Sequence, residues 1–122
     1  SVCAADKGGR VKRGQAFGHN RERQIKALLE GEGWFVIRAP GSLGFADLVA
    51  LKRGQTPRMI EVKGTAAGPF SGFGPSDRSS LSKAAKKAGA VAELAYWPAR
   101  KSLKWIAEAD WPRIATNKED TE

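Results

Sequence analysis

Three charged side chains interrupt two short apolar segments in GFADLVALKRGQTPRMIEVKG, residues 44–64. Asp47 lies at the start of the first segment, and Glu61 and Lys63 lie in the second. Carboxylate oxygens are the ligands that Mg²⁺ and Mn²⁺ prefer, and an ammonium group can hold a nucleophile or offset negative charge. Brought together, these residue types suit the metal-assisted hydrolysis of a phosphodiester.

The two segments must pair as strands for these charges to meet. Residues 45–52 and 58–64 have the pattern of strands, joined by the turn-rich RGQTP. Strand side chains alternate between two faces, so Asp47 shares a face with Val49, and Glu61 shares a face with Lys63. If paired residue numbers add to an even value near about 108 to 110, all three charges lie on one face, within roughly 5 to 7 Å; an odd value would scatter them.

Glu22 is a candidate fourth member of this group. It lies three residues before Ile25 and seven before Leu29, on the stripe of an amphipathic helix that faces the sheet. It is either an acid favoured by the dipole at the helix start or part of the cluster, and beside Asp47 and Glu61 we favour the cluster. Clustered carboxylates repel one another, and a divalent cation would relieve that repulsion. The alternative is a hairpin whose charged face is simply solvated.

Composition limits the classes of protein that fit. The 122 residues suffice for one domain with a single core. Cys3 and His19 are the only residues of their kinds, which removes an intramolecular disulfide and leaves little support for Cys- or His-based metal sites. We therefore expect a reducing, intracellular (cytoplasmic) setting. No apolar run approaches the roughly 18 residues of a membrane helix, and the start shows no signal-peptide pattern.

The formal net charge of +8 points to a polyanionic partner, most simply nucleic acid. Basic residues gather in two clusters, one between residues 7 and 26 and one at Lys83, Lys86, Lys87, Arg100, Lys101 and Lys104. A basic surface that only keeps the protein soluble is the alternative.

The element pattern predicts an α/β fold of order αβββαββ, a mixed sheet flanked by helices. We expect a flexible basic arm over residues 1–16, one domain over 17–113 and a polar tail over 114–122. Within the domain the pattern predicts helices at 20–31 and 81–89, with Asn20 capping the first and Asp77, Ser79 or Ser80 the second. The predicted strands are 34–39, 45–52, 58–64, 90–98 and 102–107.

An acid on one strand, Glu-x-Lys on the next and an upstream helical Glu resemble the PD-(D/E)XK nuclease superfamily, which implies a restriction-endonuclease-like core. The motif stands here as Ala46-Asp47 and Glu61-Val62-Lys63, with alanine where the superfamily often has proline. The segments RERQIKALLEGEGWFVIRAPGS, ADLVALKRG and MIEVKGT are more closely similar to the archaeal-type Holliday junction resolvases (Hjc) and their phage relatives. The similarity is good over residues 18–64 and extends to about 107.

This resemblance implies a Mg²⁺-dependent endonuclease, with Mn²⁺ able to substitute, that resolves four-way DNA junctions by paired symmetric nicks. Asp47, Glu61 and the Val62 carbonyl would bind the metal, Glu22 would complete the acidic site directly or through water, and Lys63 would support the attacking water. The implied DNA-binding residues are Arg10, Lys12, Arg13, Arg23, Arg38 and Ser42. The implied partners are branched DNA and a second copy in a homodimer, without a membrane or a small-molecule cofactor.

The long loop 64–80 and the substrate leave alternatives open. Phe70 and Phe73 either reach the junction or a partner subunit or pack on their own core. Trp97, Trp105 and Trp111 fit a core or a dimer interface better than base-stacking platforms. The chain could also be a superfamily nuclease with another repair or replication substrate, or a non-catalytic basic DNA-binding protein.

Overall fold

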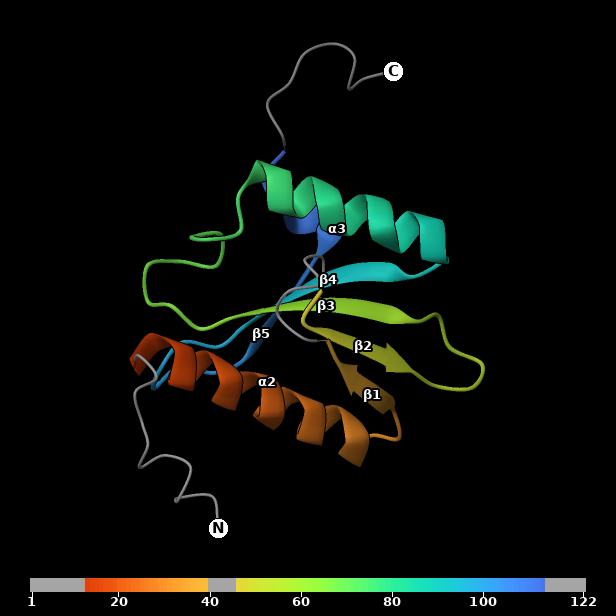
Figure 1. The fold of residues 1–122 in the computed structure, drawn as a ribbon, viewed down its shortest axis with the longest axis horizontal. Helices are drawn as coiled ribbons and strands as arrows, with labels where there is room; N and C mark the ends of the chain where they lie inside the picture. Colours follow the sequence, from red (N-terminus) through yellow and green to blue (C-terminus); the bar gives the residue numbers. More distant parts are fainter. Residues whose placement is uncertain (1–12, 40–45, 114–122) are drawn as a thin grey trace.

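A five-stranded mixed sheet between two helices forms the protein (Figure 1). The computed structural model describes residues 13–39 and 46–113. Its elements are α2 (Arg13–Gly31), β1 (Phe35–Arg38), β2 (Leu48–Leu51), β3 (Arg58–Lys63), α3 (Pro75–Ala88), β4 (Val91–Tyr96), β5 (Lys104–Ala107) and the short 3₁₀ helix η2 (Glu108–Asp110). The predicted order αβββαββ and the α/β class are confirmed.

Both helices begin earlier than the sequence predicted. α2 begins at Arg13, so residues 13–16 belong to it and not to the basic arm, and Asn20 lies inside the helix instead of capping it. Arg, Gln and Ala are strong helix formers, and no proline interrupts the segment before Asn20. α3 begins at Pro75 after Gly74, because proline is preorganised for the first helical position. None of the four candidate cap residues, Asn20, Asp77, Ser79 and Ser80, therefore caps its helix.

The end of α3 agrees with the sequence. Gly89 takes the left-handed conformation, with φ of 70°, and its amide donates to the carbonyls of Ala85 and Lys86. No helix in the described part of the chain is both long and apolar enough to span a bilayer.

The sheet has the order β1-β2-β3-β4-β5. The first three strands run antiparallel, β3 and β4 run parallel, and β5 returns antiparallel to β4. The parallel pair requires a crossover, which α3 supplies. The site residues described below lie where β2 begins and β3 ends.

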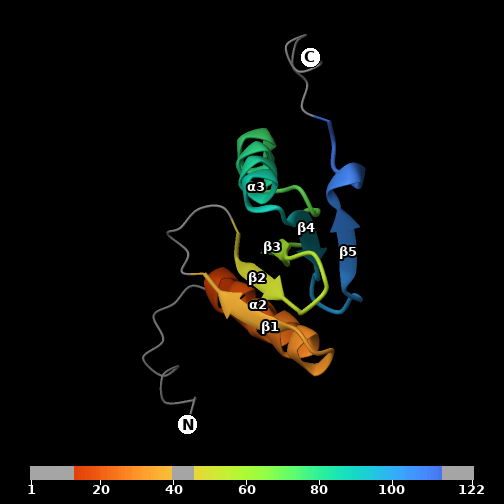
Figure 2. The same ribbon diagram turned by 90° about the vertical axis from the view of Figure 1, so that its right-hand side faces the viewer.

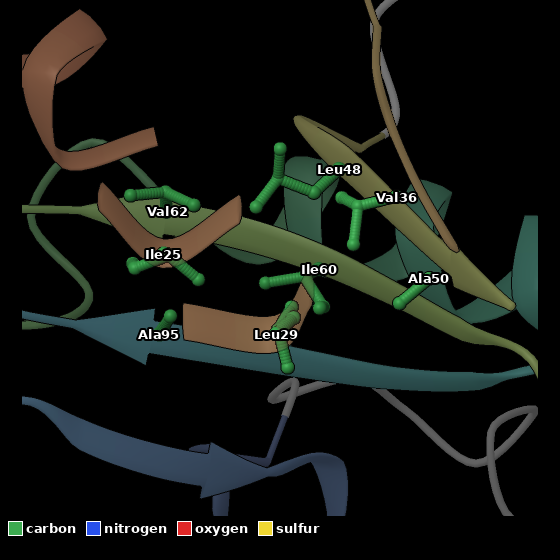
Figure 3. Packing of buried hydrophobic residues seen from close by; sticks show 8 residues of the cluster. All are labelled: Ile25, Leu29, Val36, Leu48, Ala50, Ile60, Val62 and Ala95. Carbon is green, nitrogen blue, oxygen red and sulfur yellow. The ribbon is translucent and has the colours of Figure 1, made fainter. Parts of the chain in front are cut away.

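Each face of the sheet has its own core, and Figure 2 shows the strands between the two helices. Ile25 and Leu29 of α2 pack over Ile60 and Val62 of β3, as Figure 3 shows together with the rest of this cluster. On the other face, Leu81 and Ala85 of α3 pack with β-strand residues that include Met59 and Leu94. β3 therefore contributes alternate residues to both cores, as the strand period requires.

Candidate active site

The pairing of β2 with β3 determines where the acidic residues lie. Leu48 pairs with Ile60 and Val49 pairs with Met59. The Asp47 amide donates to the Ile60 carbonyl at 2.9 Å, one residue short of an Asp47–Glu61 pair, so the pairing is bulged where β2 begins and Asp47 lies beside β3 at this point. The even register that the sequence required is confirmed.

Asp47 is fixed from both sides where β2 begins. Its Oδ2 accepts a hydrogen bond from the Val62 amide at 2.8 Å, and its backbone carbonyl accepts one from the Ala39 amide at 2.9 Å. The Asp47 carboxylate thus accepts from a β3 amide that lies beyond the backbone pairing of β2, which ends at Leu48. Burial raises the pKa of Asp47 and so does repulsion from Glu22, while the Val62 amide, Lys63 and Arg38 act in the opposite direction.

Glu61 and Lys63 form an ion pair beside Asp47. Lys63 Nζ lies 3.4 Å from Glu61 Oε2, and their side chains are 25% and 19% exposed. Burial and repulsion from Asp47 raise the pKa of Glu61 to about 7, although Lys63 opposes this shift. Two adjacent carboxylates with raised pKa values form a site that is destabilised when both are ionised.

The helix-dipole role that the sequence offered for Glu22 is wrong, and its place in the acidic cluster remains a prediction. Because α2 begins at Arg13, Glu22 lies well inside the helix and not in its first turn. Its Oε1 accepts from Arg38 Nε at 3.3 Å and from Nη2 at 3.2 Å. Glu22 is near enough to Asp47 to raise the pKa of that residue, but its direct partner is Arg38.

The donor atoms suit a divalent cation, although fewer of them converge than the sequence suggested. Among the described residues, no group of three or more Asp, Glu, His or Cys side chains is arranged to hold a metal ion. The Asp47 and Glu61 pair remains, with the Val62 backbone next to it. Hard oxygen donors and two mutually destabilising carboxylates are the features that Mg²⁺ exploits, and Mg²⁺ commonly binds proteins through one or two carboxylates. The residues present therefore fit this ion.

Residues 64–74 follow β3 directly, and two hydrogen bonds anchor this segment. Tyr96 Oη donates to the Thr65 carbonyl at 2.7 Å, and Arg78 Nη1 donates to the Phe73 carbonyl at 2.8 Å. Between these anchors Gly72, with φ of 81°, lies so near that a Cβ on it would be 3.6 Å from Lys63 Nζ. Gly72 thus lies next to the Lys63 ammonium group, with space for a methyl group between them.

Two site neighbours were missed from the sequence. Asp77, considered only as a helix cap, lies in the first turn of α3, where its charge also raises the pKa of Glu61. Gly72 was one of several loop glycines, and no sequence signal distinguishes it. The position of Asp77 could have been found if Pro75 had been recognised as the first residue of the helix.

Phe73 does not reach a junction or a partner subunit. It is 1% exposed, and its ring meets that of Trp111 edge-on with centroids 5.1 Å apart. The prediction of a junction or dimer contact is wrong for Phe73, because this ring is part of its own core. Phe70 is half-buried, with the Arg78 guanidinium 5.6 Å from its ring centroid, and its predicted contact remains a prediction.

The other predicted DNA-binding residues are placed unequally. Arg23 is exposed on α2, and Arg38 pairs with Glu22 near the acids. Arg13 begins α2, whereas Arg10, Lys12 and Ser42 lie outside the described residues.

The tryptophans follow the interpretation as core residues in part. Trp111 is buried, and Trp97 is half-buried with the Arg21 guanidinium 4.2 Å from its ring centroid. Trp105 is 39% exposed and contacts Arg58.

A family model and a solved structure both match this chain. The family model described as archaeal Holliday junction resolvase (Hjc) matches residues 13–118. The fold is similar to that of Hjc, a Holliday junction resolvase from the archaeal hyperthermophile Archaeoglobus fulgidus, with a TM-score of 0.62 and 24% identity over 79% of this chain and 76% of that one. No curated protein matches the sequence.

Proposed function

This chain belongs to the archaeal Holliday junction resolvase family, and we propose that Asp47, Glu61 and Lys63 form the site with which this junction-resolving nuclease hydrolyses DNA. The observation that carries the proposal is the position of Asp47 against β3, where the Val62 amide donates to its Oδ2 at 2.8 Å, with Lys63 Nζ 3.4 Å from Glu61 Oε2.

The residues of the site have distinct tasks. Asp47, held by the Val62 amide, and Glu61 would hold a divalent cation together with the Val62 carbonyl, and Glu22 would complete the acidic site directly or through water. A bound Mg²⁺, or Mn²⁺ in its place, would supply Lewis-acid polarisation of the phosphodiester and a water of lowered pKa. Lys63 holds the attacking water and offsets charge on the phosphate in the transition state.

Cations around the site bind the DNA backbone. Arg38 of β1 lies beside Glu22, and Arg23 is exposed on α2. These two side chains would contact phosphates on either side of the scissile bond. The side chains of Arg10, Lys12 and Arg13 and the hydroxyl of Ser42 would add further contacts to DNA. Such contacts position the substrate without reading its bases, so we expect steep salt dependence and little sequence preference.

We propose that the active species is a homodimer. A four-way junction with two-fold symmetry has two equivalent strands to nick, and a two-fold dimer has two equivalent sites. Paired symmetric nicks follow from that match of symmetry.

The test is the cleavage of an immobile four-way junction beside a linear duplex of the same arm sequence. Wild type with Mg²⁺ should nick two opposed strands of the junction and leave the duplex intact. Asp47→Asn should abolish nicking, whereas Asp110→Asn, which changes an exposed acid of η2, should not. Tight junction binding without nicking by wild type in Mg²⁺ or Mn²⁺ would exclude the proposed nuclease site.

A further inference from the structure

Two cross-strand pairs of apolar side chains lie along β1 and β2 on the face that carries Glu61 and Lys63. Phe35 pairs with Leu51, and Ile37 pairs with Val49. Cross-strand partners share a face, and Val49 pairs with Met59, which has the same strand parity as Glu61 and Lys63. We call these four residues, Phe35, Ile37, Val49 and Leu51, the β1–β2 apolar patch.

The two β1 side chains of this patch are open to solvent, whereas Leu51 is half-buried and Val49 packs against the core on the α3 side. α2 packs on the other face of β1 and β2, where Val36, Leu48 and Ala50 are buried, and α3 packs on β3 and β4. In Figure 1, β1 is accordingly the edge strand farthest from α3. Phe35 is 67% exposed and Ile37 is 45% exposed. A phenylalanine with two thirds of its surface in water is an unusual use of an aromatic side chain, and contiguous exposed apolar surface marks a site of interaction.

The patch continues directly from the candidate active site. The Ala39 amide donates to the Asp47 carbonyl, so the β1–β2 pairing extends past Ile37 and Val49 to the first carboxylate. At ordinary strand spacing, Ile37 and Phe35 lie about 7 and 13 Å along the strands from Asp47. DNA whose phosphodiester lies at Asp47 therefore passes close to this patch.

The surrounding charges agree with a DNA strand. Arg53, which is exposed, follows two residues after Leu51 at one end, and Lys63 lies at the site end. Cations beyond both ends of an apolar strip suit phosphates at the ends with sugars and base faces between them.

A second copy of the chain fits the patch less well. A stable interface needs roughly 800 Å² and 20–30 residues from each partner, and four side chains on an edge hairpin supply far less. A second copy would also bring another +8 of net charge to this surface.

We propose that the β1–β2 apolar patch binds the branch point of the four-way junction, where strands leave the regular duplex and expose sugars and base faces. The inference rests on the proposed function and adds the residues that distinguish a branch from a duplex. Apolar side chains are the groups that contact or wedge against unstacked bases, and disturbing the stack costs least where it is already interrupted.

The test compares Phe35→Thr/Ile37→Thr with a matched control, Val91→Thr. Threonine keeps the β-branched shape that suits a strand. Val91 is similarly exposed, at 43%, but alternates with the buried Ala92 and so lies on the face opposite to the patch. Binding is measured by fluorescence without divalent metal, at fixed salt, with a four-way junction carrying 2-aminopurine at the branch and with a linear duplex.

The double variant should bind the junction roughly ten-fold more weakly, with duplex affinity changed by less than about two-fold. Val91→Thr should change neither affinity. Unchanged junction binding, or an equal loss for junction and duplex, would overturn the inference. Dissociation of a wild-type dimer into monomers in the double variant would overturn it too, because the patch would then bind a second copy. If wild type nicks the junction and spares the duplex while the double variant binds both as wild type does, this inference fails and the proposed function stands.

Discussion

The Val62 amide donates a hydrogen bond to Asp47 Oδ2 at 2.8 Å, so one carboxylate both joins the start of β2 to β3 and belongs to the candidate metal site. The two tasks can be separated by mutation. Asp47→Asn keeps an oxygen that can accept from Val62, whereas Asp47→Ala removes it. Both variants should lose at least about a hundred-fold in junction nicking, because both lose the anionic ligand.

Their stabilities should differ. Asp47→Ala leaves the amide of the buried Val62 without its acceptor and should lower the free energy of unfolding by about 1–3 kcal/mol, whereas Asp47→Asn should not be less stable than wild type at pH 8. Urea denaturation of both variants measures this, and equal losses of stability would contradict the role given to the hydrogen bond.

The raised pKa of Glu61 predicts a pH-dependent stability in the absence of metal. The pKa rises from 4.5 in the unfolded chain to about 7 in the folded one, so the folded state binds the proton more tightly. Stability is therefore full below pH 4.5 and is lost as the pH rises through 7, by roughly 3 kcal/mol at most. Glu61→Gln should remove this loss and be more stable than wild type at pH 8 in EDTA, but not at pH 4.

Thermal unfolding of wild type, Glu61→Gln and the surface control Asp110→Asn across this range measures the difference. If Glu61→Gln is the less stable protein at pH 8, the glutamate is stabilised as an anion and the assigned direction is wrong.

Divalent metal should narrow that difference. A ligand that binds only the folded state stabilises it by RT ln(1 + [L]/Kd), about 1.4 kcal/mol at ten times Kd. Adding Mg²⁺ should raise the Tm of wild type and leave the Tm of Glu61→Gln and Asp47→Asn unchanged. Glu22→Gln, which alters the neighbour paired with Arg38, should keep a reduced response. A similar rise in all four proteins would indicate binding elsewhere.

Gly72→Ala tests whether the close approach of Gly72 to Lys63 matters for the reaction. Gly54 is a matched control, because its φ of 77° nearly equals the 81° of Gly72 but a Cβ there meets nothing within 4 Å. Both alanine variants should lose about 1 kcal/mol of stability from the left-handed backbone. Only Gly72→Ala should slow single-turnover nicking, by about two- to three-fold, since its methyl group would lie in van der Waals contact with Lys63 Nζ and exclude water beside it. Equal nicking rates would remove Gly72 from the site.

The sequence predicted the centre of the site because one rule governs it. The turn between β2 and β3, with its even register, brings Asp47 beside β3, and alternation puts Glu61 and Lys63 on one face; no distant part of the chain enters the argument. The same locality made Gly89 a correct helix end.

The surroundings of the site could not be predicted in this way. The pairing of Glu22 with Arg38 depends on how α2 lies across β1. Phe73 is buried because Trp111, from the far end of the chain, packs against its ring. Contacts between elements distant in sequence decided each of these positions.

β3 supplies both cores and the site from one six-residue strand, so the protein has a built-in safeguard against inactive products of folding. A slip of one residue would turn Glu61 and Lys63 toward α2 and would also bring Ile60 and Val62 out of the core that they fill. A chain that misplaced Glu61 and Lys63 would therefore also lose much of its hydrophobic core. Such a chain would not persist as a folded, inactive protein that competes for junctions.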